Sequence, residues 1–228
     1  MRLIKATLIL AGLALLATPA LAVTLNEIRI DQTSTDNQEY FELLGTPGES
    51  LGNLTYIVIG DGTGASGVIE AVVSLAGKSI GADGYFLGVE TSYGTPVCGD
   101  TPDAIFGTTL NFENSDNVTH LLVADFTGAN AQDLDTNDDG ILDSTPWSGI
   151  IDDVAVLYTA TGGDKVYSTT VIGPDGIYAP GLVLICDGYW VIGDFDLCIH
   201  DTPGMSNASA CEVPSEDTSF GSLKSLFR

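Results

Sequence analysis

The stretch Leu54-Thr55-Tyr56-Ile57-Val58-Ile59 decides the fold class of this chain. Its residues are leucine, β-branched or aromatic, and it runs directly into the turn sequence Gly60-Asp61-Gly62. Similar runs, separated by glycine, proline, asparagine and aspartate, occur at residues 25–30, 40–44, 67–73, 85–89, 118–123, 153–158, 166–171, 182–186 and 189–192. Beyond the first 22 residues, no segment of about 12 residues or more has a helical apolar period. Many short strands with frequent turns predict an all-β sandwich or barrel.

The first 22 residues have the layout of a secretory signal peptide. Arg2 and Lys5 precede an apolar run over residues 6–16, and Ala20-Leu21-Ala22 is a small-x-small cleavage sequence. The run is shorter than the roughly 20 residues that span a bilayer, which favours cleavage over a membrane anchor. We therefore expect a mature chain from Val23 with no transmembrane segment, located outside the cell, at the cell surface or in the periplasm.

The mature chain is strongly acidic. Removing residues 1–22 leaves 5 basic and 31 acidic residues, a formal charge of −26. Such a surface repels phosphate backbones, which argues against nucleic acid as a direct partner, and it suits divalent cations. Most of these carboxylates are expected to lie at the surface, solvated by water, without a role in binding.

Four cysteines behind a signal peptide favour two disulfides. Four cysteines allow three pairings. We expect Cys186 to pair with Cys198, across a short strand-rich segment, and Cys98 with Cys211. No CxxC or Cys/His cluster is present, which argues against structural zinc.

Residues 133–143 carry the sharpest chemical motif, an EF-hand-like calcium loop. Asp135 is counted as position 1 of this loop. The expected ligands are then the side chains at positions 1, 3, 5 and 9 (Asp135, Asn137, Asp139 and Asp143) and the backbone carbonyl at position 7 (Ile141). A hard cation needs six to eight oxygens at about 2.3–2.6 Å, and Gly140 at position 6 can take the positive φ of the sharp turn. The pattern predicts bound Ca²⁺ that makes the loop rigid.

This loop departs from the EF-hand at its twelfth position. Pro146 stands where a bidentate acid is usual, so Asp133, Asp152, Asp153 or water would have to supply that ligand. No helical pattern flanks the loop, which places it between strands. The alternative is an aspartate-rich turn without an ion.

No residue pattern predicts catalysis. His120 lies in an apolar strand run and is expected to be packed, and His200 precedes a turn. No G-x-S-x-G nucleophile elbow is present. Glu39 and Glu42 have an odd spacing, which places them on opposite faces of a strand and argues against a carboxylate pair. The Gly60–Gly64 stretch lacks the lysine of a phosphate loop and is expected to be a loop at one end of the sandwich.

Several motifs resemble the lamin tail domain of secreted bacterial proteins. They are Asn26-Glu27-Ile28, the strand Glu39-Tyr40-Phe41-Glu42-Leu43, the strand at 54–59 and the closing Thr202-Pro203-Gly204-Met205-Ser206-Asn207. The resemblance covers most of residues 23–207 and implies an immunoglobulin-like β-sandwich without intrinsic catalysis. We place the domain at 23–210, with long inserted loops at 91–117 and 125–149. A tail at 211–228 becomes apolar and basic after Phe220.

Three functions are consistent with these features. The first is a secreted or cell-surface, non-catalytic module with a calcium loop, which binds or scaffolds a protein or polysaccharide of the envelope or matrix. The second is an exported metal-dependent hydrolase, which requires an open metal position in a pocket. The third is a structural envelope or matrix protein, which requires exposed edge strands.

Overall fold

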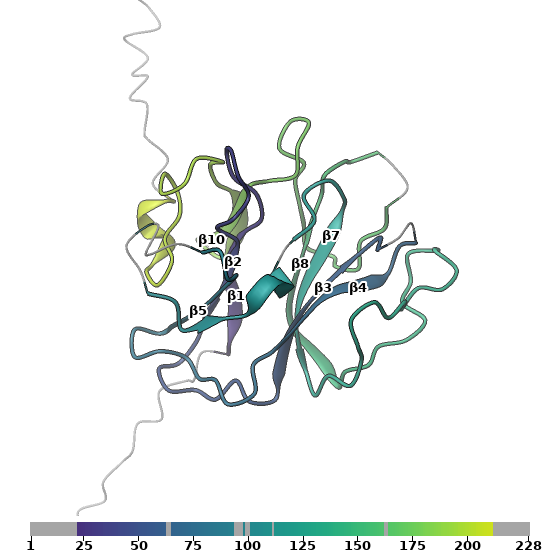
Figure 1. The fold of residues 1–228 in the computed structure, drawn as a ribbon, viewed down its shortest axis with the longest axis horizontal. Coiled ribbons are helices and arrows are strands. Elements are labelled where there is room, and N and C mark those ends of the chain that lie inside the picture. Colours follow the sequence, from purple (N-terminus) through teal and green to yellow (C-terminus); the bar gives the residue numbers. More distant parts are fainter. Residues whose placement is uncertain are drawn as a thin grey trace, which may run out of the picture.

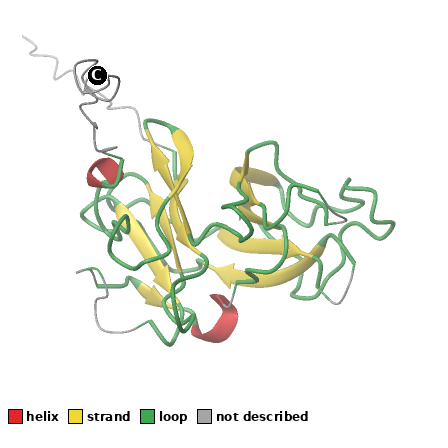
Figure 2. Cartoon of the chain, turned by 90° about the horizontal axis from the view of Figure 1, so that it is seen from above, coloured by secondary structure: helices red, strands yellow, loops and turns green. Residues whose placement is uncertain are grey.

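The computed structural model describes residues 22–62, 65–93, 98, 101–110, 112–161 and 164–211. The expected signal peptide, apart from Ala22, and tail residues 212–228 lie outside this part. Two β-sheets pack face to face (Figures 1 and 2), which confirms the predicted all-β sandwich. The strands are β1 (Thr24–Arg29), β2 (Tyr40–Leu44), β3 (Leu54–Gly60), β4 (Val68–Ser74), β5 (Tyr85–Val89), β6 (Ala104–Ile105), β7 (Val118–Ala124), β8 (Gly149–Val156), β9 (Val171–Ile172), β10 (Leu182–Cys186) and β11 (Tyr189–Ile192).

The six-stranded sheet has the order β11-β10-β1-β2-β5-β6, and the five-stranded sheet has the order β4-β3-β7-β8-β9. Neighbours are antiparallel except for the short strands β6 and β9, each of which runs parallel to its neighbour. Two short 3-10 helices, η1 (Gly107–Leu110) and η2 (Asn207–Ser209), complete the described elements. Asp187 and Gly188 connect β10 to β11 with φ values of 51° and 83°, the positive values of a two-residue hairpin turn.

Three details of the strand prediction were wrong. Of the expected strand at 166–171, only Val171 is part of β9. In the preceding residues, Tyr167 forms hydrogen bonds with groups outside a strand ladder. The Tyr167 backbone N–H donates to Thr119 Oγ1 at 3.0 Å, and its hydroxyl donates to Asp135 at 2.8 Å. Strand β8 begins at Gly149, inside the segment 125–149 that was predicted as a loop. The other predicted loop, 91–117, contains the short strand β6, which pairs with β5, and the 3-10 helix η1.

The main core lies between the sheets, but β3 and β7 are buried on both faces. Their outward-facing residues, including Ile57, Leu121 and Val123, form a second apolar cluster with Leu134. Phe126, Leu142 and Trp147 pack against this cluster. The inserted segment 125–149 therefore covers the outer face of the five-stranded sheet, which explains why these strands are apolar throughout.

The segment after β11 covers the outer face of the six-stranded sheet in the same way, and lies on the opposite side of the molecule from the 125–149 segment (Figure 1). Two disulfides, Cys98–Cys198 and Cys186–Cys211, fasten it. The expected pairing was therefore wrong. The Cα atoms of the bonded pairs are 5.1 and 5.5 Å apart, because residues 193–211 fold back over the sheet and bring Cys211 to the end of β10.

A buried ion pair holds this covering segment to β1. Arg29 and Asp201 are both fully buried, and the Arg29 Nε donates to Asp201 at 2.9 Å. Arg29 also donates to the Asp194 carbonyl at 2.8 Å, and Tyr40 donates to Asp201 at 2.9 Å. The covering segment is thus bonded to the centre of the sheet and not merely laid upon it.

The motifs that resemble the lamin tail domain meet in this same network. Glu27 accepts from the Thr202 backbone N–H at 2.9 Å and from the Thr202 hydroxyl at 2.5 Å. Asn26 donates to Asn207 at 3.0 Å and to Glu42 at 2.6 Å. Residues from the opening and closing motifs therefore satisfy each other's buried polar groups, which is a structural role.

Candidate metal centre

Asp135 is the hub of the predicted calcium loop. It is fully buried and accepts hydrogen bonds from the backbone N–H groups of Asp139 (3.2 Å) and Gly140 (2.8 Å) and from the Tyr167 hydroxyl. Burial acts to raise the pKa of Asp135, but these hydrogen bonds and nearby Lys165 lower it below its ordinary value. The loop is therefore closed around a carboxylate that stays ionised.

The other predicted ligands lie around this hub at the surface. Asn137 Oδ1 accepts from the Asp139 N–H at 3.1 Å, and Asp139 Oδ1 accepts from the Ile141 N–H at 2.9 Å. Asp143 accepts from both the backbone N–H and the hydroxyl of Thr136. Gly140 has φ +87°, the value for which the sequence required glycine.

The residues expected to replace the missing twelfth ligand lie in different parts of the fold. Asp133 lies in the loop, where its Oδ1 accepts from the Asp135 N–H at 3.0 Å. Asp152 is on β8 and accepts from the Leu25 N–H on β1 and from the Asp153 N–H, so its oxygens are engaged between the two sheets. The loop carboxylates Asp135, Asp139 and Asp143 do not form a triad with all ligand oxygens within 4.8 Å; the described residues form two such triads elsewhere.

Both of those triads contain Asp61, at the end of β3. Asp61, Glu70 and Glu113 form one, and Asp61, Asp116 and Asp164 form the other; in each, the ligand oxygens lie within 4.8 Å of one another. Asp116 comes just before β7, the antiparallel partner of β3, so the pairing of these strands brings it beside Asp61. Asp116 Oδ2 accepts from the Asp61 backbone N–H at 2.9 Å. Carboxylate groups arranged in this way could hold a metal ion, and Ca²⁺ and Mg²⁺ prefer such hard oxygen ligands.

Three of the carboxyl groups of this cluster have raised pKa values, because they are partly buried and lie close to other carboxyl groups. Burial, followed by the neighbouring acids Asp61 and Asp164, raises the pKa of Asp116 to about 7. Burial raises the pKa of Glu70, with further contributions from Glu113 and Asp61, and the pKa of Asp61 is raised as well. A divalent cation would remove this repulsion by favouring the ionised forms.

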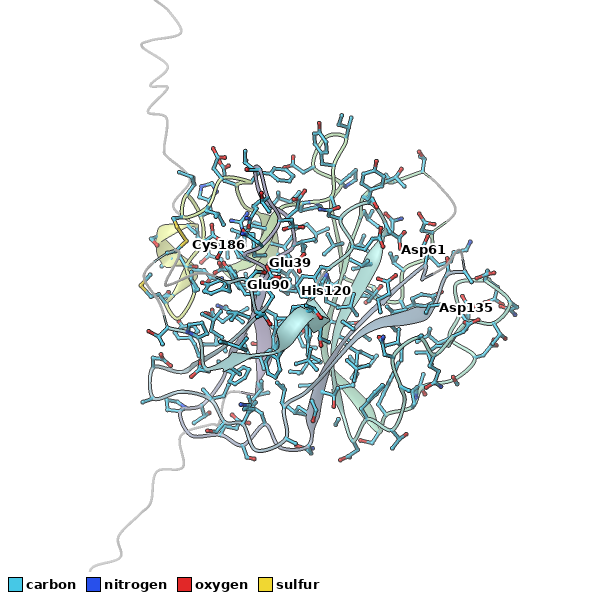
Figure 3. All side chains as sticks on the ribbon, in the orientation of Figure 1. Glu39, Asp61, Glu90, His120, Asp135 and Cys186 are labelled. Carbon is cyan, nitrogen blue, oxygen red and sulfur yellow. A yellow bond between two sulfur atoms is a disulfide. The ribbon has the colours of Figure 1, made fainter. Side chains whose placement is uncertain are left out.

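Asp61 and Asp135 lie at the same end of the sandwich (Figure 3), and Asp61 itself belongs to the turn between β3 and β4. Gly67 in that turn accepts from the Leu134 backbone N–H at 2.9 Å. A Cβ on Gly67 would come within 2.6 Å of the Asp135 Cβ, so this close approach requires glycine. The segment between β8 and β9 also connects the two sites, since it carries Asp164 of the cluster and Tyr167, whose hydroxyl donates to Asp135 of the loop.

An acidic pocket of about 360 Å³ opens beside the cluster. It is lined by Asp36, Glu70, Phe112, Glu113 and Asn114. Behind Phe112 lies Glu39, whose Oε2 accepts from the Phe112 backbone N–H at 2.9 Å. Two of the residues that line the pocket, Glu70 and Glu113, also belong to one of the two triads.

The two histidines lie outside both triads. His120 is fully buried in the core, as expected, and its Nδ1 lies 2.6 Å from the Tyr56 hydroxyl. Burial lowers the pKa of His120 to about 3, so the ring is neutral. Glu39 bonds to Phe112, whereas Glu42 bonds to Asn26 and Gly204, so these two glutamates serve separate networks.

Comparisons with known proteins give no relative: no family model matches, and no curated protein or solved structure gives a significant match. The two disulfides indicate an oxidising environment. Within the described residues, no helix has the length and apolar character needed to cross a membrane.

Sequence reasoning missed the Asp61 cluster because its members are far apart in the chain. Asp61 falls in the Gly60–Gly64 stretch, which was predicted to be a loop at one end of the sandwich, and Asp116 falls in the predicted long loop at 91–117. The usable signal was that each lies at one end of a predicted strand. Knowing that β3 pairs with β7 would have placed these two acids side by side.

Proposed function

We propose that this chain is an exported, non-catalytic β-sandwich module, related to the lamin tail domain, that binds calcium at the β3–β4 end and acts in binding or scaffolding. The observation that carries the proposal is the sharing of Asp61 by two carboxylate triads beside a second acidic loop. Burial, and then repulsion within the triads, raises the pKa of Asp61 and Asp116, and a cation that binds the ionised carboxylates of the folded protein would stabilise the folded state.

The calcium loop at residues 135–143 is the second part of the proposed region. Its glycine geometry and its ordered oxygen groups fit a calcium loop. An ion held by Asp61, Asp116 and Asp164 would tie together the segment after β3, the segment before β7 and the segment after β8, and an ion in the loop would fix the segment after β7. Calcium would thereby fix the surface at this end, where a protein or polysaccharide of the envelope or matrix would bind.

The test is thermal unfolding of residues 23–228 with calcium and with excess EGTA. A calcium concentration one hundred times Kd stabilises a protein by about 2.7 kcal/mol, which for a chain of this size raises Tm by roughly 5–11 °C. We expect a rise of this order. Equal midpoints in calcium and EGTA would overturn the calcium proposal.

Two double variants separate the sites. Asp61→Asn with Glu70→Gln should raise Tm in EGTA, because it removes the cost of burying these charges and the repulsion between them, and should shrink the calcium-dependent increment. Asp139→Asn with Asp143→Asn changes only exposed side chains of the loop and should shrink the increment by the loop's share. Asp187→Asn, in the turn between β10 and β11, is the matched control and should leave the increment unchanged.

A further inference from the structure

The outer edge of β11 differs from that of β4, the edge strand of the other sheet. β4 is covered by the segment before the calcium loop: Ile69 donates to the Gln132 carbonyl at 2.9 Å and accepts from Ala131 at 2.7 Å. β11 is the last strand of its sheet, and within the described residues no backbone hydrogen bond reaches its outer edge. Paired and unpaired positions alternate along an antiparallel ladder, so about half of the backbone groups of β11 face outward.

This open edge is apolar in an otherwise acidic protein. β11 reads Tyr189-Trp190-Val191-Ile192 and contains no charge. The side chain of Tyr189 is 74% exposed and that of Ile192 is 37% exposed. An uncharged, aromatic edge strand with unpaired backbone groups is a template for an added strand.

The chain itself provides a segment suited to this edge. Residues 220–228 read Phe-Gly-Ser-Leu-Lys-Ser-Leu-Phe-Arg, with two of the five basic residues of the mature chain and no acid. Asp187 and Asp194 flank β11, so its surroundings carry the opposite charge to Lys224 and Arg228. A second copy of the domain, by contrast, would bring another strongly acidic surface to the same edge.

The covalent structure places this segment within reach. Cys211 is bonded to Cys186, which pairs directly with Tyr189 across the hairpin. From that anchor, residues 212–219 can extend about 26 Å, whereas a new strand lies only about 5 Å from β11. A short tether gives an effective concentration in the millimolar range, which permits even a weak strand addition.

We propose that residues 220–228 bind along the open edge of β11 in the same molecule and extend the six-stranded sheet by one strand. The backbone of the segment satisfies the outward N–H and C=O groups of β11. Its apolar side chains cover Tyr189 and Ile192. The proposal is independent of calcium binding and of the proposed function.

Hydrogen exchange of the outward-facing amides of β11, those of Trp190 and Ile192, tests this proposal. We compare residues 23–228 with residues 23–219, which keep both disulfides. Exchange in β11 should be at least about tenfold faster in the shorter chain, and a synthetic peptide of residues 220–228 should restore protection at millimolar concentration. Equal exchange in the two chains would refute the proposal.

Three full-length variants sharpen the test. Replacing Phe220, Leu223, Leu226 and Phe227 together with serine keeps length and charge and should abolish protection. Tyr189→Lys with Ile192→Lys, at exposed positions of β11, should do the same by repelling the basic segment. Ile105→Lys, on the exposed edge strand β6, is the control and should change nothing. Protection that disappears on dilution would show that a second copy covers the edge, and would overturn the intramolecular arrangement.

Discussion

Replacing Glu39 with glutamine should make this protein more stable at neutral pH. Glu39 lies next to β2, its side chain is 2% exposed, and it accepts from the Phe112 N–H. Burial above all, and then the nearby carboxylates of Asp36 and Glu90, raise the pKa of Glu39 to about 10. The folded protein therefore keeps this carboxyl protonated at pH 7, whereas the unfolded chain ionises it near its ordinary pKa of 4.5.

The size of the effect follows from proton linkage. Because the folded state holds a proton that the unfolded state loses above pH 4.5, stability falls by up to about 1.4 kcal/mol per pH unit as the pH rises. Between pH 5 and pH 7 the loss due to Glu39 is about 2.5 kcal/mol, whatever the folded pKa is, provided it exceeds 7. Glutamine is a neutral isostere that can accept from Phe112 and donate to Asp36, so Glu39→Gln should gain about 3 kcal/mol over the wild type at pH 7.

Urea unfolding at half-unit steps from pH 4.5 to pH 8 measures this difference. Other acids titrate in both proteins, so the quantity to plot is the variant's free energy of unfolding minus that of the wild type. We expect this difference to rise with pH from about pH 5. Asp187→Asn, an exposed control in the β10–β11 turn, should give a flat line. Parallel curves for Glu39→Gln and wild type, or a variant that is less stable at pH 7, would show that Glu39 is ionised in the folded state.

Two further predictions concern the covering segment. Arg29→Met should lower the free energy of unfolding by about 3–5 kcal/mol, because it leaves the buried Asp201 carboxylate without its cation; a loss below 1 kcal/mol in urea unfolding would contradict this. Replacing Cys186 and Cys211 with serine opens a loop with a sequence separation of 25 and should cost about 3 kcal/mol, and peptide mapping without reduction should recover this pair and not Cys186–Cys198.

The local sequence determined the all-β fold, since nine of the ten predicted runs become strands or, for the run at 153–158, half of one. Val68 to Val73 and Leu182 to Cys186 are examples. β-branched and aromatic side chains between turn residues favour extended backbone where they can pack on a pleated, half-buried surface. The exception, 166–170, has the composition of a strand. However, the backbone N–H and the hydroxyl of Tyr167 donate hydrogen bonds to Thr119 and Asp135, and the segment does not join a strand ladder.

Part of the candidate metal site could likewise be predicted from local sequence, and part of it could not. The loop at 135–143 was predicted because its ligands are near neighbours in sequence, and Gly140 takes the expected conformation. The triads around Asp61 unite residues from 61 to 164, which only the pairing of strands brings together. Their raised pKa values also depend on burial, a property of the packed molecule.

The strands, their turns and the order of oxygen groups in one loop follow from short stretches of sequence, because each depends on residues within a few positions of one another. The pairing of the strands, the bonding of the cysteines and the covering of the outer sheet faces by two long segments depend on the tertiary structure. Contacts such as Cys98–Cys198 and Arg29–Asp201 join residues more than ninety positions apart. Their formation depends on the path of the whole chain, which no short stretch of residues specifies.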